Sequence, residues 1–382
     1  MNLIRAVSFG QILLLFSAMI SLRAEDHYVT PPGYGTNNPP YTNWADAATN
    51  IQWAVDVATN GETVWVTNGN YTLTNQVAIT NGITLRGFHG RDYTFINGNY
   101  PNTTNRCFFV SNAFAVIDGL TISNGYSTEN GGGVNLPMGT IRNSSFIKNK
   151  CAGGVGGYLY GGGGLWAYSV STLVYNCIFS NNVASNALAR VEGGAIVIAY
   201  GTVSNCVIMD NTVSSGVQAD GGGLACNGTN ANIYNCLIIR NRSSAYGGGI
   251  MYGNIQNCTV VSNYALSGGG VYSVNCTNSI VYFNAERNCN TNTTRAGNCC
   301  ISPITNLASG STNNIDADPL FVDYASGNYR LRSDSPCVNT GGNQPWMTGA
   351  GDLDGRQRIR YGRVDMGCYE MIYEGTMYRI GF

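Results

Sequence analysis

The stretch NCLIIRNRSSAYGGGIMYGNIQNCTVVSNYALSGGGVY, residues 235–272, contains the same pattern twice. Each copy has an Asn-Cys pair, four further residues, a second asparagine, a short variable segment and three glycines. Aligning this pattern along the chain gives two columns six residues apart, namely Asp118, Asn143, Asn176, Asn205, Asn235, Asn257 and Asn278, and then Asn124, Asn149, Asn182, Asn211, Asn241, Asn263 and Asn284. Successive members of the first column are 21 to 33 residues apart, so a fixed core segment alternates with a variable loop. This pattern is typical of a solenoid.

The residue types of the repeated segment indicate which solenoid it is. Segments such as VSNCVIMDN, residues 203–211, are rich in β-branched residues and too short to hold a pair of helices. A repeat of 21 residues has room for three short strands and three turns. We therefore predict an all-β fold, a right-handed parallel β-helix of about ten coils that stack ~4.8 Å apart into a rod of roughly 48 Å.

Residues of one column lie above one another in such a rod. We predict that the asparagines of the first column bond amide to amide along the stack, as amides do in cross-β assemblies. These ladder residues are Asn143, Asn176, Asn205, Asn235, Asn257 and Asn278. The glycine runs, as at 221–223 and 247–249, are expected where a turn needs positive φ or where neighbouring coils approach closely.

The cysteines need a separate interpretation, because thirteen of them leave at least one unpaired within the chain. Four share a column, where neighbouring Cβ atoms ~4.8 Å apart fit a disulfide poorly. We predict that these four form a stack of buried thiols that pack as small hydrophobic side chains; they are Cys177, Cys206, Cys236 and Cys258. Cys337 and Cys368 are the better candidate pair for a disulfide.

Composition and charge limit the function. Charged residues make up 11% of the 382-residue chain and the formal net charge is −1, so no strong field attracts nucleic acid or an anionic membrane. Residues 1–24, MNLIRAVSFGQILLLFSAMISLRA, have a basic residue, a short apolar run and a small final residue. This predicts a signal peptide and an exported protein. No segment reaches the ~18 apolar residues of a transmembrane helix.

Several segments resemble known families. FIKN at 146–149, FSNN at 179–182 and GGAI at 193–196 resemble the repeats of chlamydial polymorphic outer-membrane proteins. The wider chain resembles bacterial secreted β-helix proteins of the pectate-lyase-like superfamily. Residues 49–71 are similar to the opening of that family, in which an amphipathic helix caps the rod before the first strand. Here Thr49 and Gln52 would form a capping box, and Asn60-Gly61 would end the helix.

The C-terminal part resembles the closing region of bacterial β-helix proteins that carry a choice of surface anchors. The segments concerned are DADPLFVD, NYRLRSDSPCVNTG, GDLDGRQR and RVDMGCYE, within residues 316–370. We therefore divide the chain into a signal peptide at 1–24, an N-terminal cap at 25–61, the β-helix at 62–315 and a C-terminal closing region at 316–382. The resemblance implies export and a surface or extracellular setting, and it implies no single activity.

Charged residues recur at two further positions of the repeat. Asp210 and Arg240 are expected on adjacent coils with Lys148 in the same column, and Glu192 and Asp220 directly precede their glycine runs. Two carboxylates ~5 Å apart would act as acid and nucleophile of a retaining glycosidase, or hold Ca²⁺ against a uronate, and Lys148 or Arg240 would be the base of a lyase. The structural alternative is a surface ion pair for Asp210 and Arg240, and solvated turn residues for Glu192 and Asp220.

The strand after each Asn-Cys pair has apolar residues on both of its alternating faces. One face points inward, so the other leaves an apolar outer surface that the C-terminal region or another protein must cover. The 24 tyrosines suit stacking on sugar rings. We expect no cofactor, although GDLDG, with Asp352 and Asp354, is similar to part of a calcium loop. The predicted role is recognition or display of a polysaccharide or another envelope component at the cell surface or outside the cell; the alternative is a polysaccharide lyase or glycoside hydrolase.

Overall fold

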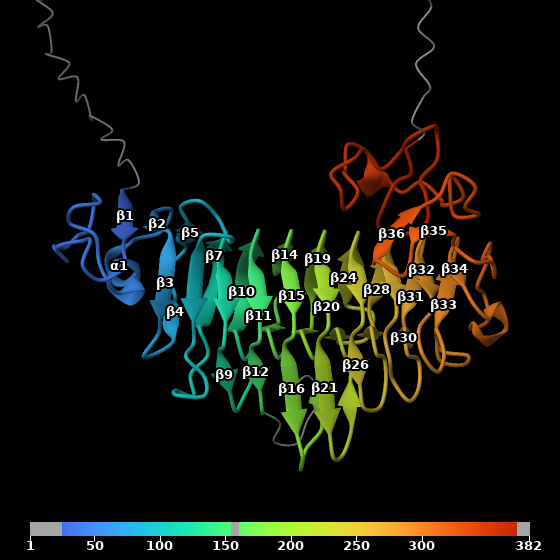
Figure 1. Cartoon of the computed structure of the whole chain (residues 1–382), viewed down its shortest axis with the longest axis horizontal. Coiled ribbons are helices and arrows are strands. Elements are labelled where there is room, and N and C mark those ends of the chain that lie inside the picture. The colour runs from blue at the N-terminus through green and yellow to red at the C-terminus, as the bar shows by residue number, and fades with distance from the viewer. Residues whose placement is uncertain (1–24, 154–159, 373–382) are drawn as a thin grey trace, which may run out of the picture.

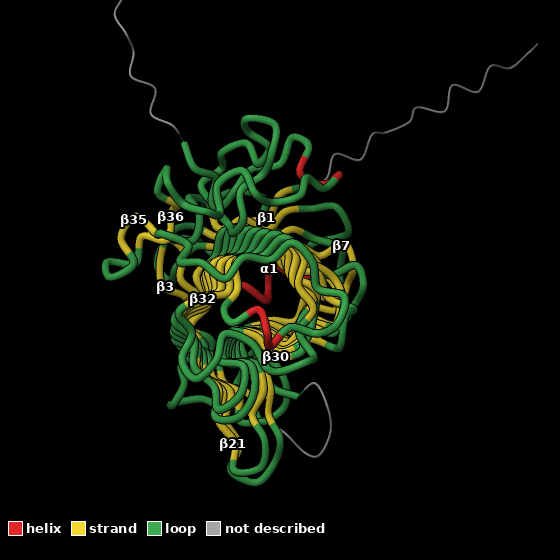
Figure 2. The backbone as a smooth tube through the Cα atoms, turned by 90° about the vertical axis from the view of Figure 1, so that its right-hand side faces the viewer, coloured by secondary structure: helices red, strands yellow, loops and turns green. Residues whose placement is uncertain are grey.

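The computed structural model describes residues 25–153 and 160–372, so the predicted signal peptide lies outside the described residues. The chain forms a right-handed parallel β-helix whose coils stack along the long axis of a rod (Figure 1). Viewed along that axis, the coils overlap as one tube (Figure 2). The fold predicted from the repeat is therefore confirmed. Within the described ranges, no helix is both long and apolar enough to cross a bilayer.

Sheet A holds two columns of parallel strands on one side of the coils. The first column contains β1 (Asp26–Val29), β2 (Thr63–Val66), β5 (Thr84–Gly87), β14 (Leu173–Tyr175), β19 (Gly201–Ser204), β24 (Ala231–Tyr234), β28 (Asn254–Gln256), β31 (Asn275–Thr277) and β33 (Arg295–Gly297). The second contains β4 (Val77–Ile79), β13 (Leu165–Ala167), β18 (Ile196–Ile198), β23 (Leu224–Cys226), β27 (Ile250–Met251) and β30 (Val271–Tyr272). Two long strands, β7 (Phe108–Asp118) and β10 (Val134–Arg142), belong to both columns and join them.

Sheet B carries the strand that follows each Asn-Cys pair. Its members are β3 (Gly69–Thr72), β6 (Thr94–Asn97), β8 (Thr121–Ser123), β11 (Ser145–Ile147), β15 (Ile178–Ser180), β20 (Val207–Met209), β25 (Leu237–Ile239), β29 (Thr259–Val261), β32 (Ile280–Tyr282) and β34 (Cys300–Ile301). The described part of the chain thus has ten strands in this sheet, one for each coil. The middle residue of each central strand, such as Phe179 or Ile208, points into the tube and is fully buried.

An arm projects from the middle coils, at the bottom of Figure 1. It consists of sheet C and the two-stranded sheet D. Sheet C contains β9 (Tyr126–Ser127), β12 (Lys150–Cys151), β16 (Val183–Asn186), β21 (Thr212–Ser215) and β26 (Arg242–Ser243), and sheet D contains β17 (Val191–Glu192) and β22 (Ala219–Asp220). A small apolar cluster, including Val191 and Val213, fills the space between them.

The N-terminal end of the tube is closed by the short helix α1 (Ile51–Val57), seen at the mouth of the tube in Figure 2. Its buried face packs into the apolar core of the rod. The expected capping box is wrong, because the N-cap is Asn50, whose side chain accepts the N–H of Gln52. The Gln52 amide instead bonds both backbone groups of Ala78 at distances of 2.7 and 3.2 Å and ties the helix to β4.

The C-terminal region folds back over the outer face of sheet B. It includes the short helix η2 (Pro345–Met347) and an antiparallel pair, β35 (Phe321–Asp323) and β36 (Asn328–Leu331), whereas the short helix η1 (Ile304–Asn306) precedes it in the last coil. An apolar cluster joins Leu237, Ile239, Val261 and Ile280 of sheet B to Phe321, Tyr329, Leu331, Met366 and Met371. Of the two predicted ways to cover the apolar outer face, this region supplies the cover on the later coils.

Two different asparagine columns run along the rod, and the continuous ladder is not in the predicted one. The buried ladder is the second column from Asn149 onward, that is Asn149, Asn182, Asn211, Asn241, Asn263 and Asn284. Its predicted first member, Asn124, is wrong by one residue, because Gly125 meets Asn149. At each step one Oδ1 accepts two bonds from the preceding asparagine; Asn211 Oδ1 accepts the backbone N–H of Asn182 at 2.9 Å and its Nδ2 at 3.0 Å.

The predicted column lies instead at an outer corner with φ near +50°, which turns its side chains outward. Only two of its neighbouring pairs bond amide to amide, Asn143 with Asn176 and Asn257 with Asn278. The alignment of its first member is also wrong by one residue, because Asp118 pairs with Arg142 and Gly119 therefore occupies the asparagine position. Gly119 has φ +70°, so glycine meets the same backbone requirement there.

The two reasons expected for the glycine runs belong to different residues of each run. Gly221 has φ +70°, in the left-handed region that favours glycine. Gly222 lies where coils approach most closely, because an added Cβ would lie 2.3 Å from the carbonyl oxygen of Gly248.

All thirteen cysteines are buried and free. In the predicted thiol column, the Cys206 thiol donates to the Ser204 carbonyl at 3.1 Å and its sulfur accepts the backbone N–H of Cys177 at 3.4 Å, so these thiols also satisfy the turn backbone. The expected Cys337–Cys368 disulfide is wrong. The backbone of Cys368 bonds the Thr259 side chain on β29, whereas Cys337 contacts Cys300 on β34. This contact, together with burial, raises the pKa of the Cys300 thiol.

Candidate functional site

A groove of about 610 Å³ crosses the outer corner between sheets A and B. One wall is the loop at 87–92 that follows β5, and the other wall is formed by Leu353 and Tyr369 of the C-terminal region. The floor is the exposed part of the outer asparagine column. The groove therefore exists because two segments far apart in sequence border the same outer corner of the rod.

The floor presents side-chain amides at the coil spacing of ~4.8 Å. Asn143 donates to Asp118 at 2.7 Å, and Asn176 donates to Asn143 at 3.2 Å. The Asn205 amide makes no hydrogen bond to any residue in the described part of the chain. Amides in such a row offer donors and acceptors to a ligand that carries hydroxyl groups at a regular spacing.

Asp118 lies between two arginines at one end of the floor. Its Oδ2 accepts bonds from Arg86 Nε at 2.8 Å and from Arg142 Nε at 2.9 Å. Burial alone would raise the pKa of Asp118, but hydrogen bonds from Asn143 and Arg86 and the charges of both arginines outweigh it and lower that pKa. Asp118 is therefore an ionised group that fixes the two guanidinium groups, and it is unsuited to donate a proton.

Arg91 forms no ion pair with the two carboxylates, Asp92 and Asp118, that line the groove with it. Its Nη1 donates to the Asn176 carbonyl at 2.7 Å, and its own carbonyl accepts a bond from the Thr121 hydroxyl at 2.7 Å, so both ends of the residue are anchored. Within residues 25–153 and 160–372, no Asp or Glu forms an ion pair with it. Its remaining N–H groups can therefore meet an anionic ligand.

The far end of the floor is aromatic. A second hollow of about 350 Å³ shares Asn205 with the groove and is lined by Tyr234 and Trp346. The two ring centroids lie 5.0 Å apart, and the indole N–H of Trp346 donates to Gln256 at 2.8 Å, which fixes the ring. The strip of surface thus passes from charged to amide-rich to aromatic.

The predicted acidic pair Glu192 and Asp220 lies on adjacent strands of the arm, in direct register. Both side chains are enclosed, with exposed fractions of 3% and 0%, so the alternative of solvated turn residues is wrong. Arg190 Nη2 lies 2.9 Å from Glu192 and 2.7 Å from Asp220 and links them. Burial raises the pKa of Asp220 despite the charge of Arg190. The geometry is that of a buried ion-pair brace, because a polymeric substrate has no access to either carboxylate.

The other predicted charged column is open to solvent. Arg240 binds Asp210 in a two-bond geometry, with both N–O distances at 2.8 Å. Lys148 lies two coils away in the same column, ~10 Å along the rod, and is exposed. These three side chains do not form a joint acid and base site.

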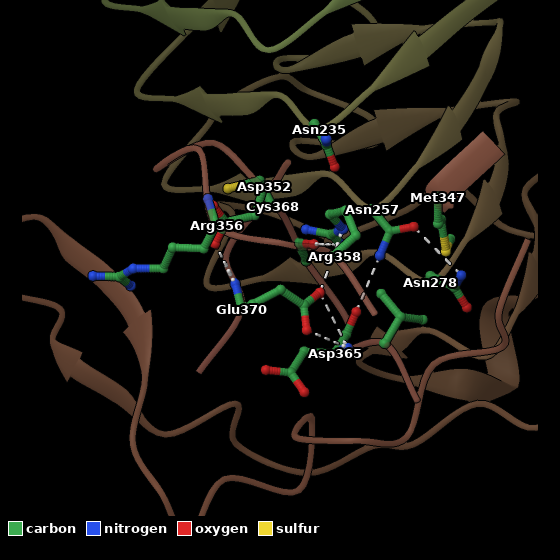
Figure 3. A network of polar contacts seen from close by, with 12 residues as sticks. Asn235, Asn257, Asn278, Met347, Asp352, Arg356, Arg358, Asp365, Cys368 and Glu370 are labelled. Atoms are coloured by element: carbon green, nitrogen blue, oxygen red, sulfur yellow. Dashed lines mark hydrogen bonds and ion pairs between the residues drawn. The ribbon is translucent and has the colours of Figure 1, made fainter. Parts of the chain in front are cut away.

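The buried network that holds the C-terminal region in place is centred on Arg358 (Figure 3). Arg358 is fully buried, lies 3.3 Å from Glu370 and donates to the Gly367 carbonyl at 2.8 Å. Asp365 accepts the N–H groups of Asn339 and Met371 at 2.6 and 2.7 Å. Burial raises the pKa of Glu370 to about 9, so this carboxyl is neutral at physiological pH.

The later asparagines of the outer column dock this network onto the rod. Asn257, beside Asp365 in Figure 3, donates to the backbone carbonyl of Asp365 at 3.0 Å. Asn235 donates to Gly351 at 2.7 Å, and Asn278 both donates to and accepts from Gly342 at 2.8 Å. This docking places Leu353 and Tyr369 at the edge of the groove.

The GDLDG segment, which is similar to part of a calcium loop, stabilises the backbone of the C-terminal region. Asp352 accepts the N–H groups of Asp354, Arg356 and Glu370, so its oxygens are committed to the backbone. In the part of the chain that the structure describes, no three His, Cys, Asp or Glu side chains are grouped as metal ligands.

Comparison with known proteins gives the fold. The chain is similar to pectate lyase Pel9A, with a TM-score of 0.55 and 14% identity over 91% of this chain and 96% of that chain. A rhamnogalacturonan lyase (TM-score 0.40, 12% identity, 84% of this chain and 97% of that one) and the pectin methylesterase from Aspergillus niger (TM-score 0.35, 12% identity, 82% and 98%) are more distant. No protein-family model and no curated protein matches the chain. The protein is thus a pectate-lyase-like parallel β-helix in fold, and its site residues come from its own geometry.

Sequence reasoning missed the groove residues Arg86 and Arg91. Both belong to β5 and the loop after it, which precede the first recognised repeat, so no column contained them. The available signal was the loop sequence GFHGRDY at 87–93, which places charged and aromatic side chains in a loop between two apolar strands.

Proposed function

We propose that this chain binds an acidic polysaccharide in the groove on its outer corner. The observation that carries the proposal is Arg91, a guanidinium anchored at both ends and without a carboxylate partner, directly beside the amide floor. A carboxylate on the ligand would complete its ion pair, and hydroxyl groups would bond the amides of Asn143, Asn176 and Asn205. The similarity of the fold to that of a pectate lyase supports a carbohydrate ligand.

The role we propose is recognition or display at the cell surface or outside the cell. The signal-peptide pattern of residues 1–24 and the resemblance to surface-anchored β-helix proteins support that location. A lyase or glycosidase is the alternative. It has less support because the predicted acidic pair of Glu192 and Asp220 is enclosed, and because Asp118 in the groove is bound by Arg86 and Arg142.

The test is calorimetric titration of the mature protein with an oligouronate and with a neutral oligosaccharide of equal length. We expect Arg91→Ala to weaken oligouronate binding by roughly tenfold to a hundredfold, the range for a lost charge-assisted contact. Arg295→Ala is the matched control, because Arg295 is exposed on β33 at the last coils and lies outside the groove.

Two outcomes would contradict the proposal. Equal affinity of Arg91→Ala and the unchanged protein would remove Arg91 from the binding site. Formation of unsaturated sugar ends, followed by ultraviolet absorbance and lost in Arg91→Ala, would replace binding with lyase activity.

A further inference from the structure

A third hollow adjoins the groove at the N-terminal cap. Its volume is about 710 Å³, and it is lined by Tyr34, Trp44 and Phe88 together with Thr30–Pro31 and Thr67–Asn70. His89 lines both this hollow and the groove, so the two form one continuous surface. The loop after β5 therefore gives Arg91 to the groove and Phe88 to the neighbouring hollow.

Aromatic rings in fixed orientations form the apolar part of this hollow. The Trp44 ring lies edge to face against Tyr28 at 4.4 Å and against Phe88 at 5.3 Å. Phe88 also contacts Trp65 at 5.8 Å, yet 46% of its surface stays exposed. Tyr34 is 80% exposed. Phe88, which is held by its ring contacts and still open to solvent, is suited to stack on an apolar face of a ligand, and the exposed Tyr34 ring lies in the same lining.

The polar groups of the hollow are neutral amides, hydroxyls and one imidazole. None of its lining residues is Asp, Glu, Lys or Arg. His89 Nδ1 lies 2.9 Å from Asn68 Oδ1, which orients the imidazole ring. Its Nε2 forms no bond with any residue in the described ranges, and a ligand hydroxyl can therefore reach it. An anionic group would lose hydration here without gaining a cation.

We propose that this hollow binds a neutral sugar unit of the polysaccharide that occupies the groove. The inference rests on the proposed function. The apolar face of the sugar ring stacks on Phe88 and Trp44, and its hydroxyl groups bond His89 and Asn68. The surface then recognises two features of one ligand: Arg91 binds a carboxylate in the groove, and the adjoining hollow binds a neutral sugar ring.

The experiment uses three probes: an oligouronate, a neutral hexose oligosaccharide, and a branched oligosaccharide whose acidic backbone carries a neutral side chain. Dissociation constants are measured for the unchanged protein, Phe88→Ala and Tyr34→Ala. We expect both variants to bind the branched probe roughly threefold to tenfold more weakly, the range for one lost aromatic contact. We expect their oligouronate affinity to stay unchanged. Phe114→Ala is the control, because Phe114 is 82% exposed on β7 and lines neither the groove nor this hollow.

Each alternative result is decisive. If the unchanged protein binds the branched probe no more tightly than the oligouronate, or if Phe88→Ala and Tyr34→Ala bind it normally, the hollow takes no sugar. Weaker oligouronate binding in Phe88→Ala would also overturn the assignment, because Phe88 would then act by positioning Arg91. Failure of the proposed function has a different signature, since Arg91→Ala would bind the oligouronate normally whatever Phe88→Ala does.

Discussion

The outer asparagine column is used differently in two halves of the rod. The open half is Asn143, Asn176 and Asn205, and the covered half is Asn235, Asn257 and Asn278. All six have φ between +49° and +54°, so the backbone turn is the same in both halves. In the open half the amides floor a groove, whereas in the covered half they bond the C-terminal region. The repeat thus determines the turn, and the segment that lies over the turn determines its use.

The largest effect is expected when the C-terminal region is detached from the covered half. Arg358→Met removes the buried guanidinium and leaves the acids Asp352, Asp365 and Glu370 without it. Breaking one side of a buried ionic network costs about 3–5 kcal/mol. We expect the C-terminal region to detach, which limited proteolysis and binding of a hydrophobic dye to the freed sheet B would report.

The control for this change is Arg332→Met. Arg332 pairs with Asp334 on the surface, and both side chains are more than half exposed. We expect its proteolysis pattern to match that of the unchanged protein. A folded, protease-resistant Arg358→Met variant would show that the apolar cluster alone holds the C-terminal region.

The second prediction separates the two asparagine columns. Asn211→Ala interrupts the buried ladder: the N–H of Asn182 loses its acceptor, and the bonds that Asn211 Nδ2 donates to the Phe179 carbonyl and to Asn241 Oδ1 are lost. Each unsatisfied buried group costs about 1–3 kcal/mol, so we expect a loss of about 2–4 kcal/mol in the free energy of unfolding, measured in denaturant. Asn176→Gly keeps the positive φ of the open column and should change that free energy by less than about 1 kcal/mol. Equal losses in the two variants would contradict the division between ladder and floor.

The fold could be predicted from the sequence because every repeat places the same demands on backbone conformation. Six-residue spacing, β-branched strands and glycine runs each constrain every coil in the same way. The two asparagine columns share that spacing, so the spacing alone could not tell which column turns inward. The three-dimensional structure is needed to show that Asn211 lies inside the tube and Asn176 outside it.

The candidate site was not predictable for a different reason. Its distinctive residues lie outside the repeat: Arg91 in a loop of an early coil, and Tyr369 in the C-terminal region. Their meeting depends on the return of the chain over the rod, and no periodic pattern records that return. Asp220 is enclosed within the arm instead, where Arg190 links it to Glu192 on the neighbouring strand.

The third prediction is that raising the pH detaches the C-terminal region from the covered half. Glu370 has its pKa raised to about 9 by burial, so the folded protein holds a proton there that the unfolded chain releases near its usual pKa. Its contribution to stability is therefore complete below the unfolded pKa and is lost as pH rises through about 9. Burial also raises the pKa of Asp365 beside it, which acts in the same direction. We expect a smaller effect than that of Arg358→Met, because the guanidinium stays in place.

The measurement is the rate of C-terminal proteolysis at pH 7 and pH 10 with a protease active at both. Glu370→Gln keeps a neutral side chain of the same shape and should reduce the difference between the two rates. An identical pH response in this variant would assign the effect to other groups, such as the Cys368 thiol, whose pKa burial raises to about 12.

The smallest effect is expected for surface ion pairs near the boundary of the two halves. Asp210 and Arg240 form an ion pair in the solvent-exposed charged column, and 35% of the Asp210 side chain and 45% of the Arg240 side chain are exposed. Asp210→Asn keeps the shape and tolerates the positive φ, so only the charge is lost, and exposed pairs contribute about 0.2–1 kcal/mol. Asp354 meets both Arg330 and Arg356 and is only 19% exposed, so Asp354→Asn should lower the free energy of unfolding by more. Added salt should erase the first loss and reduce the second only partly, because screening acts on solvated charges. A salt-resistant loss in Asp210→Asn would contradict the assignment of Asp210 and Arg240 as a solvated surface pair.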